Sequence, residues 1–418
     1  MISEEIKKFI LKRSLENFLR YVRVWTTSSE DSSTNPSTRN QFELGNLLKE
    51  ELEDLGLENI IHDEYGYVYA FLKASNGLEK VKGIGFIAHL DTSPAVSGQN
   101  VKPVMHRNYD GSEIKFDSNN EISLSIKDSI QLKSYIGLDI ITSEGDTLLG
   151  ADDKAGIAEI MAACAAWTKY PELKHGPIII CFTPDEEVGK GTNKIDQSKL
   201  PNICYTIDGS EMGELEFECF DAWKAIIKFN GSSVHPGRAK DLMINAIHIA
   251  SRFLSEIPET ESPEHTENRE GFYHLKNLKG KVEEAEAKLI IRDFELENNK
   301  KRMKFLQRLK EMYELKYPGL KIELNIEHQY KNMLNNIEKD KQVIELARKA
   351  IEMADLEVQV HPIRGGTDGA RLSEMGIPTP NIFTGGLLFH SKKEYIPTKA
   401  LQKATEVIIN LAYLWSIN

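Results

Sequence analysis

The sequence is poor in cysteine and in long apolar runs, and its basic residues are outnumbered by acidic ones. Its four cysteines, Cys164, Cys181, Cys204 and Cys219, lack the spacing of a metal site, so we expect reduced core residues of a cytoplasmic protein. No apolar run approaches membrane length, and the first residues do not resemble a secretory signal. A net charge of −12 without a basic stripe argues against nucleic acid and anionic membranes as partners.

The glycine-rich stretches lack the features of a phosphate-binding loop. Neither the stretch from Gly150 to Gly156 nor Arg364-Gly365-Gly366 has the spacing that ends in Gly-Lys-Ser or Gly-Lys-Thr. The sequence therefore disfavours a nucleotide site.

Length and the order of the expected elements indicate two domains. The 418 residues exceed what one hydrophobic core usually holds. From Phe220 to Tyr330 the pattern is strand, helix, strand, strand, helix, strand, which is the order of a ferredoxin-like α+β unit; its first helix is expected over Asp241–Ile257. On either side, strands and helices follow an α/β pattern, with one strand over Glu357–Pro362. We predict one domain of residues 1–219 and 331–418, and a second of residues 220–330 inserted into it.

Three carboxylates directly follow a buried strand. The apolar run that begins at Ile178 stops at Pro184, and Asp185, Glu186 and Glu187 come next. Like charges at adjacent positions repel, so the fold gains from three of them only where something positive binds. A solvated acidic turn is the alternative interpretation.

Histidines and aspartates occupy similar places elsewhere. His89 ends a strand, and Asp91, two residues on, faces the same side. Asp152 opens a helix, Asp208 closes another strand, and His390 follows two glycines and three apolar residues. Alone, each has an ordinary explanation: a hydrogen-bonded pair, a helix N-cap, a turn residue or a core histidine. Because ligands of open α/β sheets gather outside the carboxyl ends of the strands, these residues together predict one site.

The inserted segment adds two candidates. His235 lies in a loop, and Arg292 ends a strand just before Asp293. A solvated loop histidine and a local ion pair of Arg292 with Asp293 or Glu295 are the alternatives.

Two imidazoles with four carboxylates suit zinc or a similar divalent cation. The set is His89, Asp152, Glu186, Glu187, Asp208 and His390. It exceeds the needs of one tetrahedral ion, and a carboxylate shared by two ions would use the surplus.

The motifs around these residues resemble the co-catalytic zinc peptidases of the carboxypeptidase G and aminoacylase type. In order, they are His89-Leu90-Asp91-Thr92, Gly150 to Gly156, Thr183 to Gly189, Asp208-Gly209 and His390. Four stretches resemble the tripeptide aminopeptidases of that family more closely: Leu149 to Met161, Val234 to Gly237, Ile290 to Phe294 and Arg364 to Gly369. The resemblance covers nearly the whole chain. It implies a mixed, mostly parallel sheet flanked by helices, with the ferredoxin-like domain inserted as a lid.

The resemblance also implies roles for the matching residues. Each chain would hold two Zn²⁺ ions, one through His89 and Asp208 and the other through Glu187 and His390, with Asp152 bridging them. Asp91 would orient His89, and Glu186 would act as the general base. The residues expected to bind substrate are His235, Arg292 and Arg364.

The activity implied is release of the N-terminal residue of a tripeptide by a hydroxide that bridges the two metals. Short peptides would be the partners, and two copies of the chain would pair through the inserted domain. The alternative is a deacylase, dipeptidase or carboxypeptidase of the same family.

Overall fold

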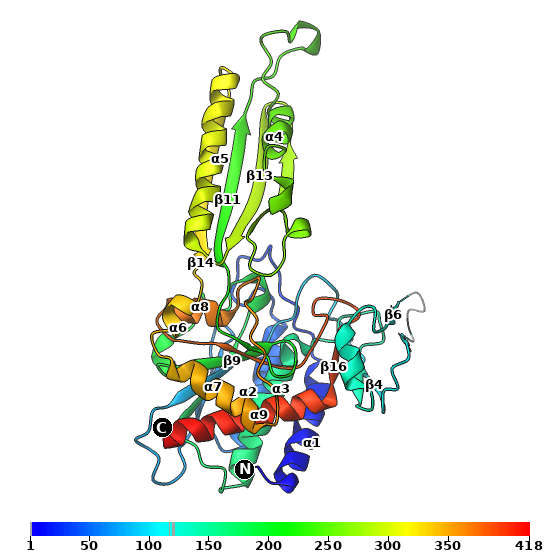
Figure 1. The fold of residues 1–418 in the computed structure, drawn as a ribbon, viewed down its shortest axis with the longest axis vertical. Helices are drawn as coiled ribbons and strands as arrows, with labels where there is room; N and C mark the ends of the chain where they lie inside the picture. The colour runs from blue at the N-terminus through cyan, green and yellow to red at the C-terminus, as the bar shows by residue number, and fades with distance from the viewer. Residues whose placement is uncertain (1, 117, 119–121) are drawn as a thin grey trace. The chain divides into compact units, whose positions relative to one another are not determined.

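The computed structural model describes residues 2–116, 118 and 122–418 (Figure 1). The chain divides into two compact units. Unit 1 comprises Met1–Phe217, Asn335–His361 and Thr367–Asn418. Unit 2 comprises Glu218–Leu334 and Pro362–Gly366, so the chain enters it twice.

A mixed sheet of seven strands, counted over the described residues, forms the centre of unit 1. In spatial order the strands are β1 (Glu58–His62), β2 (Val68–Leu72), β8 (Ile178–Thr183), β3 (Ile84–His89), β9 (Cys204–Gly209), β15 (Asn381–Phe383) and β10 (Leu215–Glu216). The strands β8, β3, β9 and β15 run parallel to one another, while β1, β2 and β10 pair in antiparallel fashion at the two sides. This confirms the predicted mixed, mostly parallel sheet.

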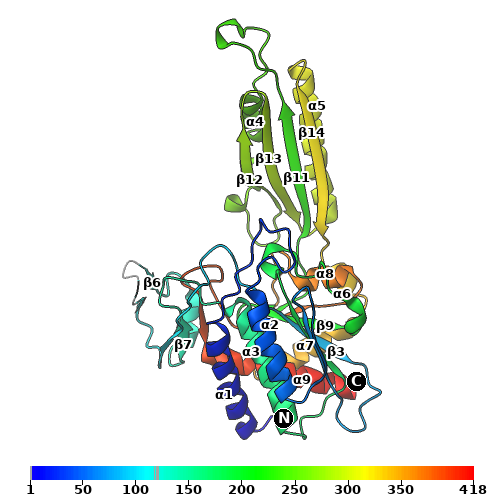
Figure 2. The same cartoon turned by 180° about the vertical axis from the view of Figure 1, so that it is seen from behind.

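Helices cover both faces of this sheet. They are α1 (Glu4–Tyr21), α2 (Gln41–Asp54), α3 (Ala151–Lys169), α7 (Gln342–Met353), α8 (Asp368–Glu374) and α9 (Thr398–Ile417). The single turn α6 (Leu334–Ile337) begins at the last residue of one segment of unit 2. Successive residues of β3 point to opposite faces: Phe86 stacks on Trp167 of α3, whereas Ile87 packs with Leu372 of α8. Helices α1, α3 and α9 also pack against one another (Figure 2).

Short strands form two small sheets beside the main one in unit 1. One joins β16 (Tyr395–Pro397), β7 (Ile140–Thr142) and β4 (Val104–His106), and the other joins β5 (Ile114–Lys115) to β6 (Ser123–Leu124). They enclose a separate apolar cluster that contains Tyr135 and Tyr395.

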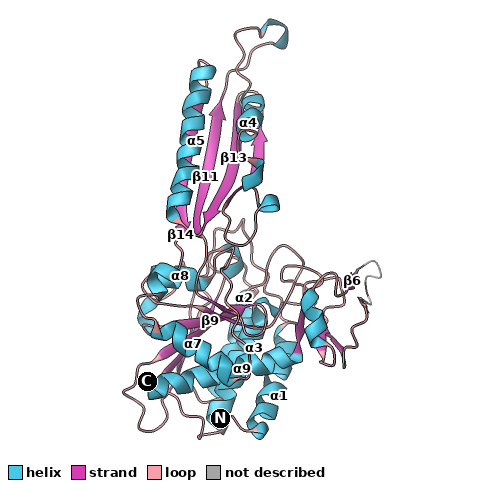
Figure 3. Cartoon of the chain, in the orientation of Figure 1, coloured by secondary structure: helices cyan, strands magenta, loops and turns pink. Residues whose placement is uncertain are grey.

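Unit 2 has the order of elements that the sequence predicts. Its elements are β11 (Asp221–Asn230), α4 (Ala246–Leu254), β12 (Phe272–Gly280), β13 (Glu284–Asp293), α5 (Leu296–Lys316) and β14 (Lys321–Tyr330). The strands form an antiparallel sheet in the order β12-β13-β11-β14, and both helices share one apolar core with it (Figure 3). This is a ferredoxin-like arrangement.

Two predicted elements are wrong. The strand expected over Glu357–Pro362 is not formed; the structure has a single bridge at Gln359, and Pro362 has no N–H with which to continue a ladder. The helix expected over Asp241–Ile257 is shorter, because Asp241 has a φ of 60° and Asn245 caps the helix by accepting a hydrogen bond from the His248 N–H.

None of the helices in the part of the chain that the structure describes has the length and apolar character needed to cross a bilayer.

Candidate metal centre

The carboxyl ends of the parallel strands bring the predicted residues together. His89 is the last residue of β3 and lies in register with Thr183, the last residue of β8. Asp208 is at the end of β9, which pairs in parallel with β3. Since parallel strands end at one edge of the sheet, side chains that follow each strand converge there.

A tight loop before helix α3 brings Asp152 to the same edge. Gly150 has a φ of 82°, a conformation that favours glycine, and Asp152 keeps non-helical dihedrals at the helix start. One turn on, a side chain at Gly156 would collide with the carbonyl oxygen of Ile207 in β9. The small residues of this stretch thus let helix α3 approach the end of β9 closely.

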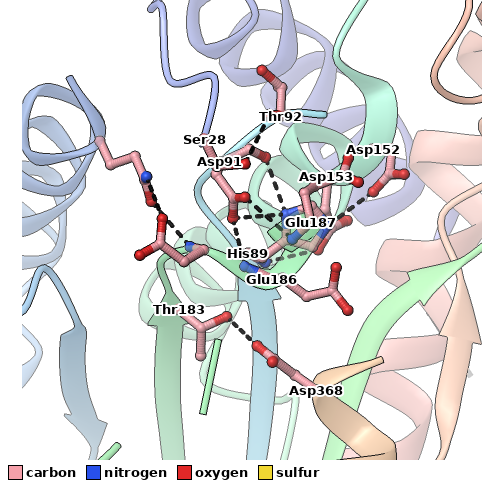
Figure 4. A network of polar contacts seen from close by, with 12 residues as sticks. Ser28, His89, Asp91, Thr92, Asp152, Asp153, Thr183, Glu186, Glu187 and Asp368 are labelled. Atoms are coloured by element: carbon pink, nitrogen blue, oxygen red, sulfur yellow. Dashed lines mark hydrogen bonds and ion pairs between the residues drawn. The ribbon is translucent and has the colours of Figure 1, made fainter. Parts of the chain in front are cut away.

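Two overlapping groups of side chains could each hold a metal ion. The first is His89, Asp152 and Asp208, and the second is Asp152, Glu187 and His390; within each group the ligand atoms lie within 4.8 Å of one another. Asp152 belongs to both groups. Its Oδ1 lies 2.8 Å from Nε2 of His89, and its Oδ2 lies 3.1 Å from Nε2 of His390. The contacts of His89, Asp152 and Glu187 belong to the polar network of Figure 4.

The remaining distances complete the two groups. Oδ1 of Asp208 lies 3.5 Å from Nε2 of His89, and Oε2 of Glu187 lies 2.9 Å from Nε2 of His390. The structure therefore brings together the five residues predicted as ligands, with Asp152 in the shared position.

Asp91 holds two parts of the site at once. Its carboxylate accepts hydrogen bonds from the backbone N–H groups of Glu186 (2.9 Å) and Glu187 (3.2 Å). Nδ1 of His89 lies 3.0 Å from the backbone carbonyl of Asp91 and 3.5 Å from its Oδ1. Asp91 thus contacts the imidazole, chiefly through its backbone carbonyl, and holds the turn that carries both glutamates. Its role in orienting His89 for metal binding stays a prediction.

The two adjacent glutamates have different places. Asp185 has a φ of 61°, which turns the chain sharply after β8, and its buried carboxylate accepts hydrogen bonds from Ser37 and Gln41. Glu187, rather than Glu186, supplies the oxygen of the second metal group. Glu186 follows Asp185 directly in the same turn, with its backbone held by Asp91.

Burial and repulsion perturb these carboxyl groups. Burial, followed by the charge of Asp208, raises the pKa of Glu186 well above its ordinary value. Burial and the charge of Asp152 raise the pKa of Glu187 to about 8. Hydrogen bonds to Asp152 and Glu187 raise the pKa of His390 to about 10. Burial opposes ionisation of Asp152, but its hydrogen bonds with His390 and His89 outweigh burial and hold its pKa below the ordinary value.

These features fit divalent cations. Several buried carboxyl groups crowd one edge of the sheet, and a positive ion is what would let them ionise together. The buried Oε1 of Glu187 has no hydrogen-bond partner among the described residues, as expected of an oxygen kept for a metal. Imidazole and carboxylate donors together suit zinc.

Three other buried acids surround the centre, and the sequence did not assign them roles. Asp153 accepts a hydrogen bond from the backbone N–H of His89 (3.0 Å), and Asp368 accepts one from the Thr183 hydroxyl (2.6 Å). Glu394 accepts three from the loop that bears Asp152. Asp153 lies in the stretch from Gly150 to Gly156 and Asp368 in that from Arg364 to Gly369, whereas Glu394 has no local signal beyond following His390 by four residues.

The predicted substrate-binding residues lie in unit 2. His235 is exposed and accepts a hydrogen bond from the Gly237 N–H. Arg292, 8% exposed, donates to the carbonyls of Trp223 and Ile291 and to the side chain of Gln329. Arg364 donates to backbone carbonyls of residues 266–270, so its guanidinium is engaged within the unit. The roles of all three in substrate binding stay predictions.

A cavity of about 530 Å³ within unit 1 adjoins the second metal group. It is lined by Ser28, Ser29, Glu30, Asp31, Ser93, Pro94, Ala95, Glu187 and His390. Polar and acidic side chains thus face the space beside two of the candidate ligands.

Comparison with known proteins agrees with this geometry. The sequence pattern of peptidase family M20/M25/M40 matches residues 144–413. Peptidase T of Clostridium acetobutylicum is 47% identical over 408 residues, which cover 97% of this chain and all of that protein.

Two solved structures show the same fold. A tripeptidase from Staphylococcus aureus has a TM-score of 0.77 at 22% identity, with 98% of this chain and 99% of that one covered. A dinuclear metal binding peptidase of the M20 family from Bacillus subtilis has a TM-score of 0.67 at 14% identity, with 98% and 99% covered. Because the family pattern matches residues 144–413 and a relative is 47% identical over 97% of the chain, the chain belongs to peptidase family M20/M25/M40.

Proposed function

We propose that this protein is a di-zinc aminopeptidase that releases the N-terminal residue of tripeptides. The observation that carries the proposal is the carboxylate of Asp152, which lies between the imidazoles of His89 and His390 and belongs to both metal groups. The names of the similar proteins, peptidase T and a tripeptidase, support the choice of substrate.

His89 and Asp208 would hold one ion, and Glu187 and His390 the other, with Asp152 shared between them. When bound, such cations would lower the pKa of a coordinated water molecule and polarise the scissile carbonyl. The five ligands come from different segments, so the fold itself sets the spacing of the two sites.

Glu186 would transfer a proton from the attacking water to the leaving amine. Its backbone N–H is fixed by Asp91, and its carboxyl group is separate from the two ligand groups. A carboxylate there can accept a proton from the attacking water and return it to the leaving amine. The arrangement gives adjacent glutamates separate tasks: Glu187 binds metal and Glu186 carries the proton.

The cavity beside the second metal group supports an aminopeptidase over a carboxypeptidase. Glu30 and Asp31 are among the residues that line it, and their negative charge favours the free ammonium group of a peptide N-terminus. A carboxypeptidase would instead need a positive group at the corresponding position.

Residues of unit 2 would bind the other end of the peptide. The guanidinium of Arg292 is buried and donates to the neutral oxygens of Trp223, Ile291 and Gln329, so a C-terminal carboxylate would be a better acceptor for it. His235 would stabilise the oxyanion, and Arg364 would support the same site through residues 266–270.

We also infer that unit 2 acts as a lid and that two copies of the chain pair through it. A cytoplasmic location is a separate inference, which the four unpaired buried cysteines support.

A panel of matched peptides tests the proposal. The free tripeptide should be cleaved to an amino acid and a dipeptide, whereas its N-acetylated form should be a poor substrate. The C-terminally amidated form should be cleaved with a raised KM. Preferred cleavage of the N-acetylated peptide, or release of the C-terminal residue, would instead support a deacylase or a carboxypeptidase.

A further inference from the structure

The loop from Leu387 to Tyr395, which carries His390 and Glu394, is closed by backbone hydrogen bonds between its two ends. Leu387 and Tyr395 exchange backbone hydrogen bonds of 2.9 and 3.1 Å, which pins the two ends of the loop together. Between them, Leu388 and His390 take left-handed φ values of 56° and 59°. The loop therefore presents the imidazole of His390 in a fixed position and buries Glu394 at its base.

The carboxylate of Glu394 accepts hydrogen bonds from three backbone N–H groups at the start of helix α3 and in the loop before it. Its Oε2 accepts hydrogen bonds from Leu149 (2.8 Å) and Gly150 (2.9 Å), and its Oε1 accepts one from Asp152 (3.1 Å). Glu394 is 1% exposed. A buried carboxylate is tolerated only when its oxygens are well satisfied, and these three donors satisfy them.

The segment from His390 to Glu394 thus contacts Asp152 at two points, one on its side chain and one on its backbone. His390 contacts the Asp152 side chain at Oδ2, and Glu394 accepts from the Asp152 backbone N–H. The first contact alone would leave the backbone free to rotate, and the second alone would leave the carboxylate free to swing. Together they fix both the dihedrals and the side-chain direction of the residue shared by the two metal groups.

We propose that Glu394 is a positioning residue that sets the carboxylate of Asp152 between the two metal ions. The inference rests on the proposed metal-dependent function, but it concerns metal binding and not the choice of peptide. Residues that orient metal ligands typically contribute about 10–100-fold to metal affinity. We expect a loss of that size when Glu394 loses its hydrogen bonds.

Glu394→Gln is the appropriate variant because it keeps the size of the side chain. An amide has one acceptor oxygen and one NH₂ donor, so at least one of the three N–H groups would face another donor. The matched control is Asp63→Asn. Asp63 also accepts two backbone hydrogen bonds, from Tyr65 and Tyr67 at 3.0 Å each, but in the turn between β1 and β2.

The readout is titration of the metal-free full chain with Zn²⁺ against a chelating dye, together with the visible spectrum of the Co²⁺-loaded protein. Glu394→Gln should bind Zn²⁺ about 10–100-fold more weakly and alter the Co²⁺ absorption, whereas Asp63→Asn should match the wild type in both. A variant that fails to fold would be replaced by Glu394→Asp, for which a smaller loss in the same direction is expected.

Two results would overturn the inference. Native affinity and spectrum in folded Glu394→Gln would mean that Glu394 only caps helix α3. Equal losses in the Asp63→Asn control would mean that the effect is general destabilisation. Failure to cleave tripeptides would contradict the proposed function while leaving this metal readout intact, so the two can be told apart.

Discussion

Replacing Glu186 by glutamine separates proton transfer from metal binding. Glutamine has nearly the same shape, and the backbone N–H of residue 186 would still donate to Asp91. Because the ligand oxygen of the second group comes from Glu187, both ions should remain bound. The variant should therefore lose only the contribution of a general base, and its kcat should fall about 10²–10⁴-fold. This corresponds to about 3–5 kcal/mol of activation free energy.

The assay pairs kcat on a free tripeptide with the metal content of the same sample. Glu187→Gln is the matched control, since it removes a candidate ligand at the adjacent position and should lower the metal content as well as kcat. Full activity in Glu186→Gln would refute its role as the base. Loss of metal from Glu186→Gln to the same extent as from Glu187→Gln would show that the two glutamates do not divide the tasks as described.

Two further predictions concern substrate binding and pH. Arg292→Ala should raise KM for a free tripeptide far more than for its C-terminal amide, because only the free peptide offers a carboxylate to the guanidinium; equal effects on both would exclude carboxylate binding. Burial lowers the pKa of His175 below its ordinary value of 6.5, so protonation favours the unfolded chain. Its contribution to stability is complete above about pH 6.5 and is lost as the pH falls. When the pH is lowered from about 8 to about 5, the Tm of His175→Gln should therefore fall less than the Tm of the wild type. An equal fall in Tm for the two proteins would contradict this.

The sequence predicts most of the candidate centre because its residues sit at the ends of recognisable elements. An apolar run that stops at an acid or a histidine marks the carboxyl end of a strand, and parallel strands bring those ends together. His89, Asp208 and the turn after Thr183 follow this logic. The order of the strands and helices in unit 2 could also be predicted, because the succession strand, helix, strand, strand, helix, strand is typical of a ferredoxin-like unit.

What could not be predicted depends on contacts between distant segments. Glu394 is satisfied by backbone N–H groups, which every residue but proline carries, so no pattern in the sequence marks its partners. The segment around Gln359 has the composition of a strand but gains only one bridge, because pairing depends on a neighbouring strand edge. Helix α4 starts late because of the cap at Asn245, a detail that periodicity alone does not reveal.

The carboxylate of Asp152 is proposed to serve two metal ions, and counting the bound ions tests this sharing most directly. Wild-type protein, Asp208→Asn and Asp152→Asn would each be dialysed against excess Zn²⁺, freed of unbound metal and analysed for zinc per chain. We predict two zinc ions per chain in the wild type. Asp208→Asn should keep one ion, because Asp208 belongs to only one of the two metal groups, and Asp152→Asn should lose both. A wild-type protein with one ion, or an Asp152→Asn variant that keeps two, would contradict the shared site.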